Sequence, residues 1–308
     1  MEVLRALDDV PDGHASAVTI GFFDGVHRGH RAVIGRTVHV ARERGLRSVV
    51  VTFDRHPLET LSPGKVPSLL TTLEQKAELI DELGVDALFV LGFTEEVSRW
   101  SPEGFVDRVL ARGLEARFVI VGTNFTFGHR AAGNLPVLAD LGQANGFDVE
   151  GMGINKLDGR PVSSTAIREA LVEGDLTWAE RALGRRFAVR GRVVAGAGRG
   201  ANLGFPTANL ETPPGMLLPG MGVYAGRAFV DGDAWIAAIN IGVNPTFGRD
   251  PLHLEAYLLG FDGDLRGRPI EVEFWARLRD EQRFASAEAL SRQIAEDVER
   301  TKEIVPTS

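Results

Sequence analysis

The sequence contains no cysteine. Disulfide bonds, thiolate metal sites and cysteine nucleophiles are therefore excluded together. It also lacks any stretch near the roughly 18 consecutive apolar residues of a membrane-spanning helix. Glu2, Asp8 and Asp9 stand where a secretory signal carries positive charge. We expect a cytoplasmic protein with no membrane partner.

Basic residues are scarcer than acidic ones, 34 against 42, which gives a formal net charge of -8. A general nucleic-acid surface needs a basic stripe that releases counterions, so the sequence predicts no nucleic-acid partner. Any anion must instead be bound locally. With 44% hydrophobic residues and a length of 308, the chain is suited to two folded domains.

The first half of the chain alternates apolar runs with helix signals. Thr72 forms a capping box with Gln75, and Ser101 precedes Pro102 at the start of a second helix. The near-continuous apolar runs are typical of strands covered on both faces and occupy residues 17–23, 48–53, 87–93 and 118–125. Repeated units of this kind predict an α/β fold with a doubly wound parallel sheet.

In the second half, strands follow strands. After two short helices in residues 164–184, Asp231 and Gly232 separate two runs as in a tight hairpin, and Ser286 opens a final helix. The runs occupy residues 187–196, 222–230, 234–243, 253–261 and 270–278. This all-β pattern predicts an antiparallel barrel or sandwich. We place the domains at residues 1–184 and 185–308.

The segment GFFDGVHRGH, residues 21–30, follows the first predicted strand. In an open parallel sheet, ligands bind beyond the carboxyl ends of the strands, and a helix start offers free N–H groups to an anion. His27 and His30 could both donate to a phosphate and stabilise the charge that grows at phosphorus. Two other interpretations stay open: solvated or core histidines, and a zinc site of His27, His30 and Asp24.

Two further segments carry hydroxyl, amide or glycine residues suited to phosphate. SSTAIR, residues 163–168, places three hydroxyls at a helix start with Arg168 in the next turn, although Ser and Thr are also common helix caps. GAGRGANLGFPTANL, residues 196–210, has glycines at alternate positions with no helix after them. By itself this spacing favours a bulged hairpin over a dinucleotide site.

Taken together, GFFDGVHRGH, VVTFDRHP, VGTNFTFG, PVSSTAIREAL, PTAN and HLEAYLL resemble the bifunctional riboflavin kinase/FAD synthetase family of bacteria over nearly the whole chain. The resemblance implies an N-terminal nucleotidylyltransferase-like sheet and a C-terminal riboflavin kinase-like antiparallel β-barrel with a terminal helix. It implies two reactions. ATP phosphorylates riboflavin to FMN, and a second ATP adenylylates FMN to FAD with release of pyrophosphate.

The same resemblance assigns roles to residues. His27 and His30 would be catalytic in adenylyl transfer, and Glu255 would be the general base of the kinase. Thr207 and Asn209 would hold Mg²⁺. Nucleotide-binding residues would be Gly21, Phe23, Asp24, Gly25, Gly29, Ser163, Ser164, Thr165, Arg168, Gly196, Gly198 and Gly200. Flavin-binding residues would be Asn124, Phe125 and Phe127, although the two phenylalanines fit a plain core equally well.

Two positions depart from the family pattern, and two other functions stay open. Phe22 stands where Asn or a smaller residue is common, and Arg266 stands where an aromatic residue usually precedes the glycine. One alternative function is an adenylyltransferase with another acceptor, in which the barrel only binds ligand. The other is a flavin-binding module without turnover, although mere binding does not require all the predicted catalytic and metal residues at once.

Overall fold

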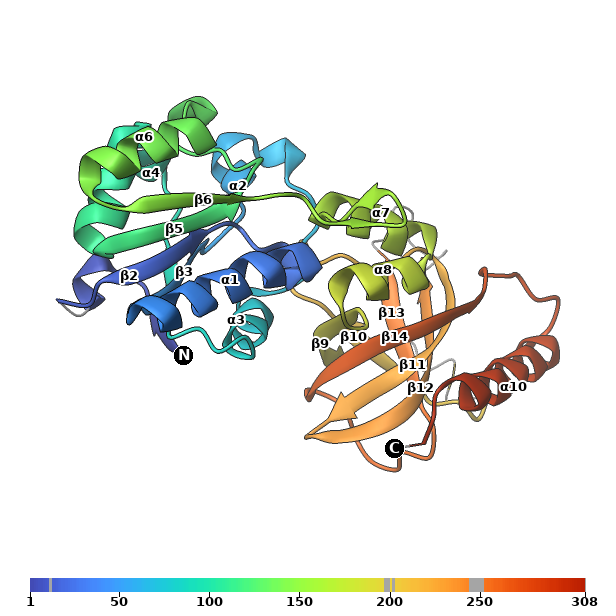
Figure 1. The fold of residues 1–308 in the computed structure, drawn as a ribbon. Helices are drawn as coiled ribbons and strands as arrows, with labels where there is room; N and C mark the ends of the chain where they lie inside the picture. Colours follow the sequence, from blue (N-terminus) through green and yellow to red (C-terminus); the bar gives the residue numbers. More distant parts are fainter. Residues whose placement is uncertain (11–12, 197–199, 201–202, 244–251, 308) are drawn as a thin grey trace. The chain divides into compact units, whose positions relative to one another are not determined.

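A computed structural model describes residues 1–10, 13–196, 200, 203–243 and 252–307. By packing, the chain divides into two units (Figure 1). The first comprises Met1–Pro67 and Thr71–Ser164, and the second comprises Ser68–Leu70 and Thr165–Ser308. This division falls at residue 164, whereas the functional boundary expected at residue 184 stays a prediction.

The first unit contains a parallel sheet of six strands, as a doubly wound fold requires. Its spatial order is β1-β4-β3-β2-β5-β6, and every pairing is parallel. Because β2 lies between β3 and β5, the chain leaves β2 and β5 toward opposite edges, which makes this the topological switch point where ligands bind. The strands are β1 (Glu2–Leu4), β2 (Ser16–Ile20), β3 (Arg47–Phe53), β4 (Ala87–Leu91), β5 (Ala116–Gly122) and β6 (Asp148–Met152).

Helices cover both faces of this sheet, so alternate strand residues enter different cores. Val50 packs toward α1 (Arg28–Arg44) and α3 (Leu73–Asp81), whereas its neighbours on β3 pack with α6 (Leu135–Asn145). The same second face is covered by α5 (Pro102–Phe105) and the π-helical η4 (Val106–Gly113). The remaining short elements are η1 (Leu7–Asp9), η2 (Asp24–Val26), α2 (Pro57–Leu61), η3 (Pro63–Lys65), α4 (Glu95–Ser98), η5 (His129–Ala131), β7 (Lys156–Leu157) and β8 (Arg160–Pro161).

The expected helix starts are confirmed. The Thr72 side chain accepts from the Gln75 N–H, and the Gln75 side chain accepts from the Thr72 N–H, which completes the capping box of α3. The Ser101 hydroxyl caps α5 by accepting from the Gly104 N–H.

The second unit contains a closed barrel, which confirms the antiparallel architecture. Its order is β10-β13-β12-β11-β14-β9, and all pairings are antiparallel. Asp231 and Gly232 both have positive φ and form the predicted hairpin turn. The strands are β9 (Ala188–Val194), β10 (Ala208–Glu211), β11 (Gly222–Val230), β12 (Asp233–Gly242), β13 (His253–Leu258) and β14 (Pro269–Arg279).

Among the described residues of the second unit, the helices are α7 (Ser164–Glu173), which begins at its boundary, α8 (Leu176–Leu183) and the terminal α10 (Ala287–Ile304). Ser286 caps α10 as expected. A bidentate pair between Arg279 on β14 and the buried Asp297 ties α10 to the barrel: Nε donates to Oδ1 at 3.1 Å, and Nη2 donates to Oδ2 at 2.7 Å. Within the described ranges, no helix is both long and apolar enough to cross a membrane.

Candidate active sites

The segment between β2 and α1 is a turn with unusual backbone geometry. Phe23, Gly25 and Val26 have φ values of 53°, 77° and 39°. The left-handed region suits glycine but is costly for a β-branched residue such as Val26. The strand therefore ends at Ile20 rather than at Phe23, and the chain enters α1 at Arg28.

The two histidines of this turn stack on each other. His27 is the N-cap of α1, and its Nδ1 accepts from the His30 N–H at 3.3 Å. The ring centroids lie 3.5 Å apart with an interplanar angle of 20°. Because Nδ1 of His27 is an acceptor, the neutral ring carries its proton on Nε2, which is then the donor of this side chain.

The electrostatic surroundings keep His30 neutral. Burial lowers its pKa well below 6.5, and the neighbouring His27 and the ammonium of Lys76 lower it further. Its Nδ1 is buried and has no hydrogen-bond partner among the described residues. A neutral imidazole still donates one N–H bond, which is what a phosphate oxygen needs.

Asp24 lies under the turn. Its carboxylate is only 2% exposed, and Oδ1 accepts from the backbone N–H and the hydroxyl of Thr71 at 3.1 and 3.3 Å. The Thr71 hydroxyl in turn accepts from the Gly25 N–H at 3.1 Å. The Ser164 hydroxyl donates to the Asp24 carbonyl at 3.0 Å. Asp24 therefore holds the backbone of the turn, and its carbonyl binds the hydroxyl of Ser164 from the SSTAIR segment.

The other residues predicted to bind nucleotide at this turn differ in their burial and contacts. A Cβ on Gly29 would lie 3.1 Å from Cε1 of His27, and one on Gly21 would lie 2.9 Å from the Phe23 ring, so glycine leaves room for both rings. Phe23 itself is buried and meets His30 edge to face. Ser163 is half-buried just before α7.

Thr165 and Arg168 belong to the second unit. There, Arg168 Nε donates to the carbonyl of Ser68 at 2.6 Å, and Thr165 is exposed. A contact of these two residues with nucleotide stays a prediction.

The three residues predicted for flavin binding follow β5. Asn124 is exposed in the turn after the strand. Phe125 and Phe127 stack with centroids 5.5 Å apart, and Phe127 is buried in the core beside Phe105. The phenylalanines therefore act as core side chains of the first unit, and a flavin contact for all three residues stays a prediction.

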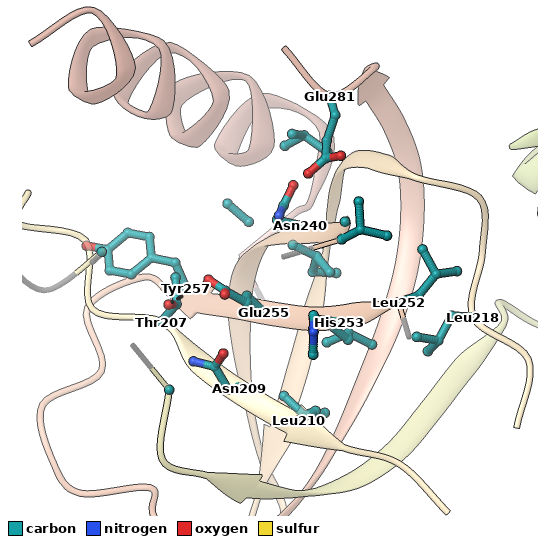
Figure 2. A pocket seen from close by; sticks show the side chains of 18 of the residues that line it. Thr207, Asn209, Leu210, Leu218, Asn240, Leu252, His253, Glu255, Tyr257 and Glu281 are labelled. Atoms are coloured by element: carbon teal, nitrogen blue, oxygen red, sulfur yellow. Dashed lines mark hydrogen bonds between the residues drawn. The ribbon is translucent and has the colours of Figure 1, made fainter. Parts of the chain in front are cut away.

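Two residues predicted in the barrel, Asn209 and Glu255, form a row across three strands together with Asn240, which was not predicted (Figure 2). Glu255 on β13 pairs directly with Asn209 on β10 and with Asn240 on β12. The hydroxyl of Thr207, just before β10, donates to Oε2 of Glu255 at 3.1 Å. Alternation along β13 buries Leu254, while Glu255 points to the outer face. The structure thus brings together the predicted base and both predicted metal ligands.

This row lines a cavity of about 1770 Å³. The glycine-rich segment borders it at close range. A Cβ on Gly200 would lie 2.4 Å from the Phe205 carbonyl, which leaves no room for a side chain, and one on Gly196 would lie 2.1 Å from Nδ2 of Asn209 and displace that amide. The predicted nucleotide-binding Gly198 lies outside the described residues.

Sequence reasoning missed Thr71 and Asn240. Thr71 had no signal, because its partner Asp24 lies 47 residues away. Asn240 does interrupt the apolar run of β12, and such an outward polar residue could have been noticed. The zinc alternative gains no support, because the described part of the chain holds no group of three His, Asp or Glu side chains arranged for a metal ion.

Comparison with known proteins identifies a family for each half of the chain. The family model for FAD synthetase matches residues 10–166, and that for riboflavin kinase matches residues 183–305. A bifunctional riboflavin kinase/FMN adenylyltransferase from Pseudomonas fluorescens is 41% identical over 100% of this chain and 99% of the relative. The chain belongs to this bifunctional family. The resemblance inferred from the motifs is therefore confirmed.

Other relatives of the family match at similar length. The namesake protein of Escherichia coli K12 is 36% identical over 96% of both chains, and that of Listeria monocytogenes is 37% identical over 92% of this chain and 91% of the relative. A crystal structure described as a macrolide-efflux protein from Streptococcus pneumoniae superposes with a TM-score of 0.88 at 27% identity. It covers 97% of this chain and 98% of that one.

Proposed function

We propose that this chain makes FAD from riboflavin in two steps. The barrel unit transfers the γ-phosphoryl group of ATP to riboflavin and yields FMN and ADP. The first unit then joins FMN to the AMP part of a second ATP and releases pyrophosphate. Two observations support the proposal: the matched family models cover both halves of the chain, and each half carries its own group of polar side chains suited to a nucleotide.

In the kinase step, Glu255 takes the proton of the riboflavin 5′-hydroxyl as the oxygen forms its bond to the γ-phosphorus and the bond to ADP breaks. A carboxylate can do this once the hydroxyl is within hydrogen-bond reach and in line with the phosphate. The bond from Thr207 fixes Oε2. This leaves Oε1 as the oxygen to receive the proton.

The residues beside Glu255 fit Mg²⁺. Thr207 and Asn209 offer neutral oxygen donors, and the Thr207 proton is directed at Glu255, so its lone pairs remain for a cation. Magnesium prefers oxygen ligands and needs few from the protein, because phosphate and water complete its shell. When bound, the ion neutralises charge on the phosphates. Thr207 and Asn209 would hold it.

In the adenylyl step, a phosphate oxygen of FMN attacks the α-phosphorus of ATP, and the bond to pyrophosphate breaks. His27 donates through Nε2–H and His30 through its one N–H to the oxygens that gain charge. Because the stacked rings are fixed before substrate arrives, they need no reorganisation during the reaction. No covalent enzyme intermediate is required.

The stacked histidine pair at the start of α1 and the Thr207–Glu255 hydrogen bond carry the proposal. The test incubates the purified chain with riboflavin, ATP and Mg²⁺ and follows FMN, FAD, ADP and pyrophosphate. The expected result is ADP appearing with FMN, and pyrophosphate appearing with FAD. Absence of both ADP and pyrophosphate would refute the proposal and leave an adenylyltransferase with another acceptor or a flavin-binding module.

A further inference from the structure

Lys76 is a charged residue in the core of the first unit. It lies on α3 and is only 2% exposed. Transfer of an ammonium group from water to a protein interior is costly unless other groups compensate. The roles proposed for His27 and His30 in the first unit, and for Glu255 in the barrel, do not require a lysine at this position.

The residues that Lys76 contacts connect it to the turn that carries His27 and His30. Its Nζ lies 3.9 Å from the centroid of the Phe22 ring and donates to the Thr52 hydroxyl at 3.5 Å. The Thr52 hydroxyl in turn donates to the Phe22 carbonyl at 3.1 Å. The Phe22 ring also meets His56 edge to face, at 4.7 Å. Lys76 therefore contacts both the ring of Phe22 and the group that holds its backbone, one residue before the left-handed turn begins.

The start of α3 holds the same turn from another side. Thr71, just before the N-cap of α3, binds the Asp24 carboxylate and the Gly25 N–H. The carboxylate of Asp24 acts on Lys76 and raises its pKa, but burial acts more strongly, and the resulting pKa is about 8. The charge of Lys76 also lowers the pKa of His30.

Among the described residues, Lys76 interacts electrostatically with Asp24 from η2 and with His30 from α1, and His56 at the start of α2 contacts the Phe22 ring that Lys76 lies over. With His30 neutral, the protonated ammonium of Lys76 supplies positive charge next to this part of the site.

We propose that Lys76 is a positioning residue for adenylyl transfer: it holds Phe22 and the Asp24 turn under the histidine pair and adds positive charge behind the site that receives a nucleotide triphosphate. This inference rests on the function proposed for the first unit. A phosphate group would experience the charge strongly, because a buried cation acts in a medium of low dielectric constant. Loss of the proton from Lys76 would then slow the reaction.

The first experiment measures Lys76 directly and needs no activity. The chain has four lysines, Lys65, Lys76, Lys156 and Lys302. In protein labelled at lysine Cε, one carbon signal should titrate near pH 8 and be absent in Lys76→Met. A spectrum in which no lysine signal titrates near pH 8 would overturn the inference.

The second experiment measures kcat/KM for ATP in FAD formation from supplied FMN between pH 6.5 and 9.5. This parameter reports ionisations of the free enzyme. Wild-type activity should fall as the pH rises through about 8, because the cation is lost. Lys76→Met should be about tenfold slower at pH 7, less than for loss of a direct donor, and should lack the fall near pH 8. Lys76→Arg should keep activity at pH 7 and also lack that fall.

Control variants distinguish a failure of the inference about Lys76 from a failure of the proposed function. Lys65→Met removes a charge from an exposed lysine and should behave like wild type, and kinase turnover should be unchanged in every variant. If Lys76→Met has the wild-type rate and pH profile, the inference is overturned and the proposed function stands. If the wild-type chain makes no FAD at any pH, the proposed function fails and takes the inference with it, whatever the lysine titration shows.

Discussion

Replacement of Lys76 by methionine should stabilise the first unit at neutral pH. The folded unit holds the pKa of Lys76 at about 8, against 10.5 for an ordinary lysine. At about 1.4 kcal/mol per pKa unit, this difference corresponds to roughly 3 kcal/mol by which the folded state disfavours the charge. Methionine has nearly the same length and no charge, and it adapts to irregular space. It loses the cation–π contact with Phe22, about 1 kcal/mol.

The net gain at pH 7 is therefore about 2 kcal/mol, and it should depend on pH. The unfolded chain binds the Lys76 proton more tightly than the folded chain, so wild-type stability rises as the pH increases from about 8 toward 10.5. Methionine has no proton to lose. The advantage of the variant should shrink by about 2 to 3 kcal/mol between pH 7 and pH 10.

Native-state hydrogen exchange can measure this in the intact chain. Peptides from β2 and β3 report the first unit, and peptides from β11 report the barrel as an internal control. After correction for the intrinsic rate at each pH, exchange of β2 and β3 at pH 7 should be slower in the variant, by about 30-fold for 2 kcal/mol, with β11 unchanged. Faster exchange of β2 and β3 in the variant, or a gain that is equal at pH 7 and pH 10, would refute the reasoning.

Three further predictions concern the two sites and the terminal helix. His30→Ala should slow FAD formation by about 2 to 4 kcal/mol of transition-state stabilisation and spare the kinase, with the exposed His39→Ala on the same helix as the control; equal loss of both activities would contradict separate sites. Glu255→Gln should stop FMN formation yet leave FAD formation from supplied FMN, and persistent FMN production would show that the base is another group. Asp297→Ala leaves Arg279 largely buried without its carboxylate partner, so exchange of α10 should reveal a loss of about 3 to 5 kcal/mol; unchanged protection would contradict the pair's role.

The central strands of both units could be predicted because their apolar runs are long. The strands that were missed are short or lie at an edge. β1 and β6 have only three and five residues, and β6 includes Asp148, Glu150 and Gly151. Their pairing with β4 and β5 makes them strands, and this is tertiary information. β10 has four residues and joins β9 to β13 to close the barrel. Propensity over so few residues could not predict it.

The candidate sites could be predicted where one short segment carries the chemistry. His27 and His30 are three residues apart, and a helix start places them together. The row of Glu255, Asn209 and Asn240 is different, because alternation predicts only the face of each strand. The register that makes them neighbours is set by barrel closure over about 50 residues of chain.

The sequence predicts on which face of α3 Lys76 lies, but not where its ammonium group ends. It is three residues after Leu73 and four before Ile80, so it shares the face of α3 that packs on the sheet. The spacing alone therefore indicates a lysine on an apolar face. A long side chain at such a position commonly extends its charge to water, and only the packed structure reveals that Nζ ends over Phe22 instead.

Strain and buried charge coincide at the histidine turn. Phe23 and Val26 hold left-handed φ values that cost about 1 to 3 kcal/mol each, and Lys76 beside them adds its own cost. Such features persist only where the surrounding structure fixes them, here through Thr71 and Ser164, which bind Asp24. The left-handed residues and the buried lysine lie close to the stacked histidines. This is expected of a functional site in which a fixed geometry is maintained at a cost in folding stability.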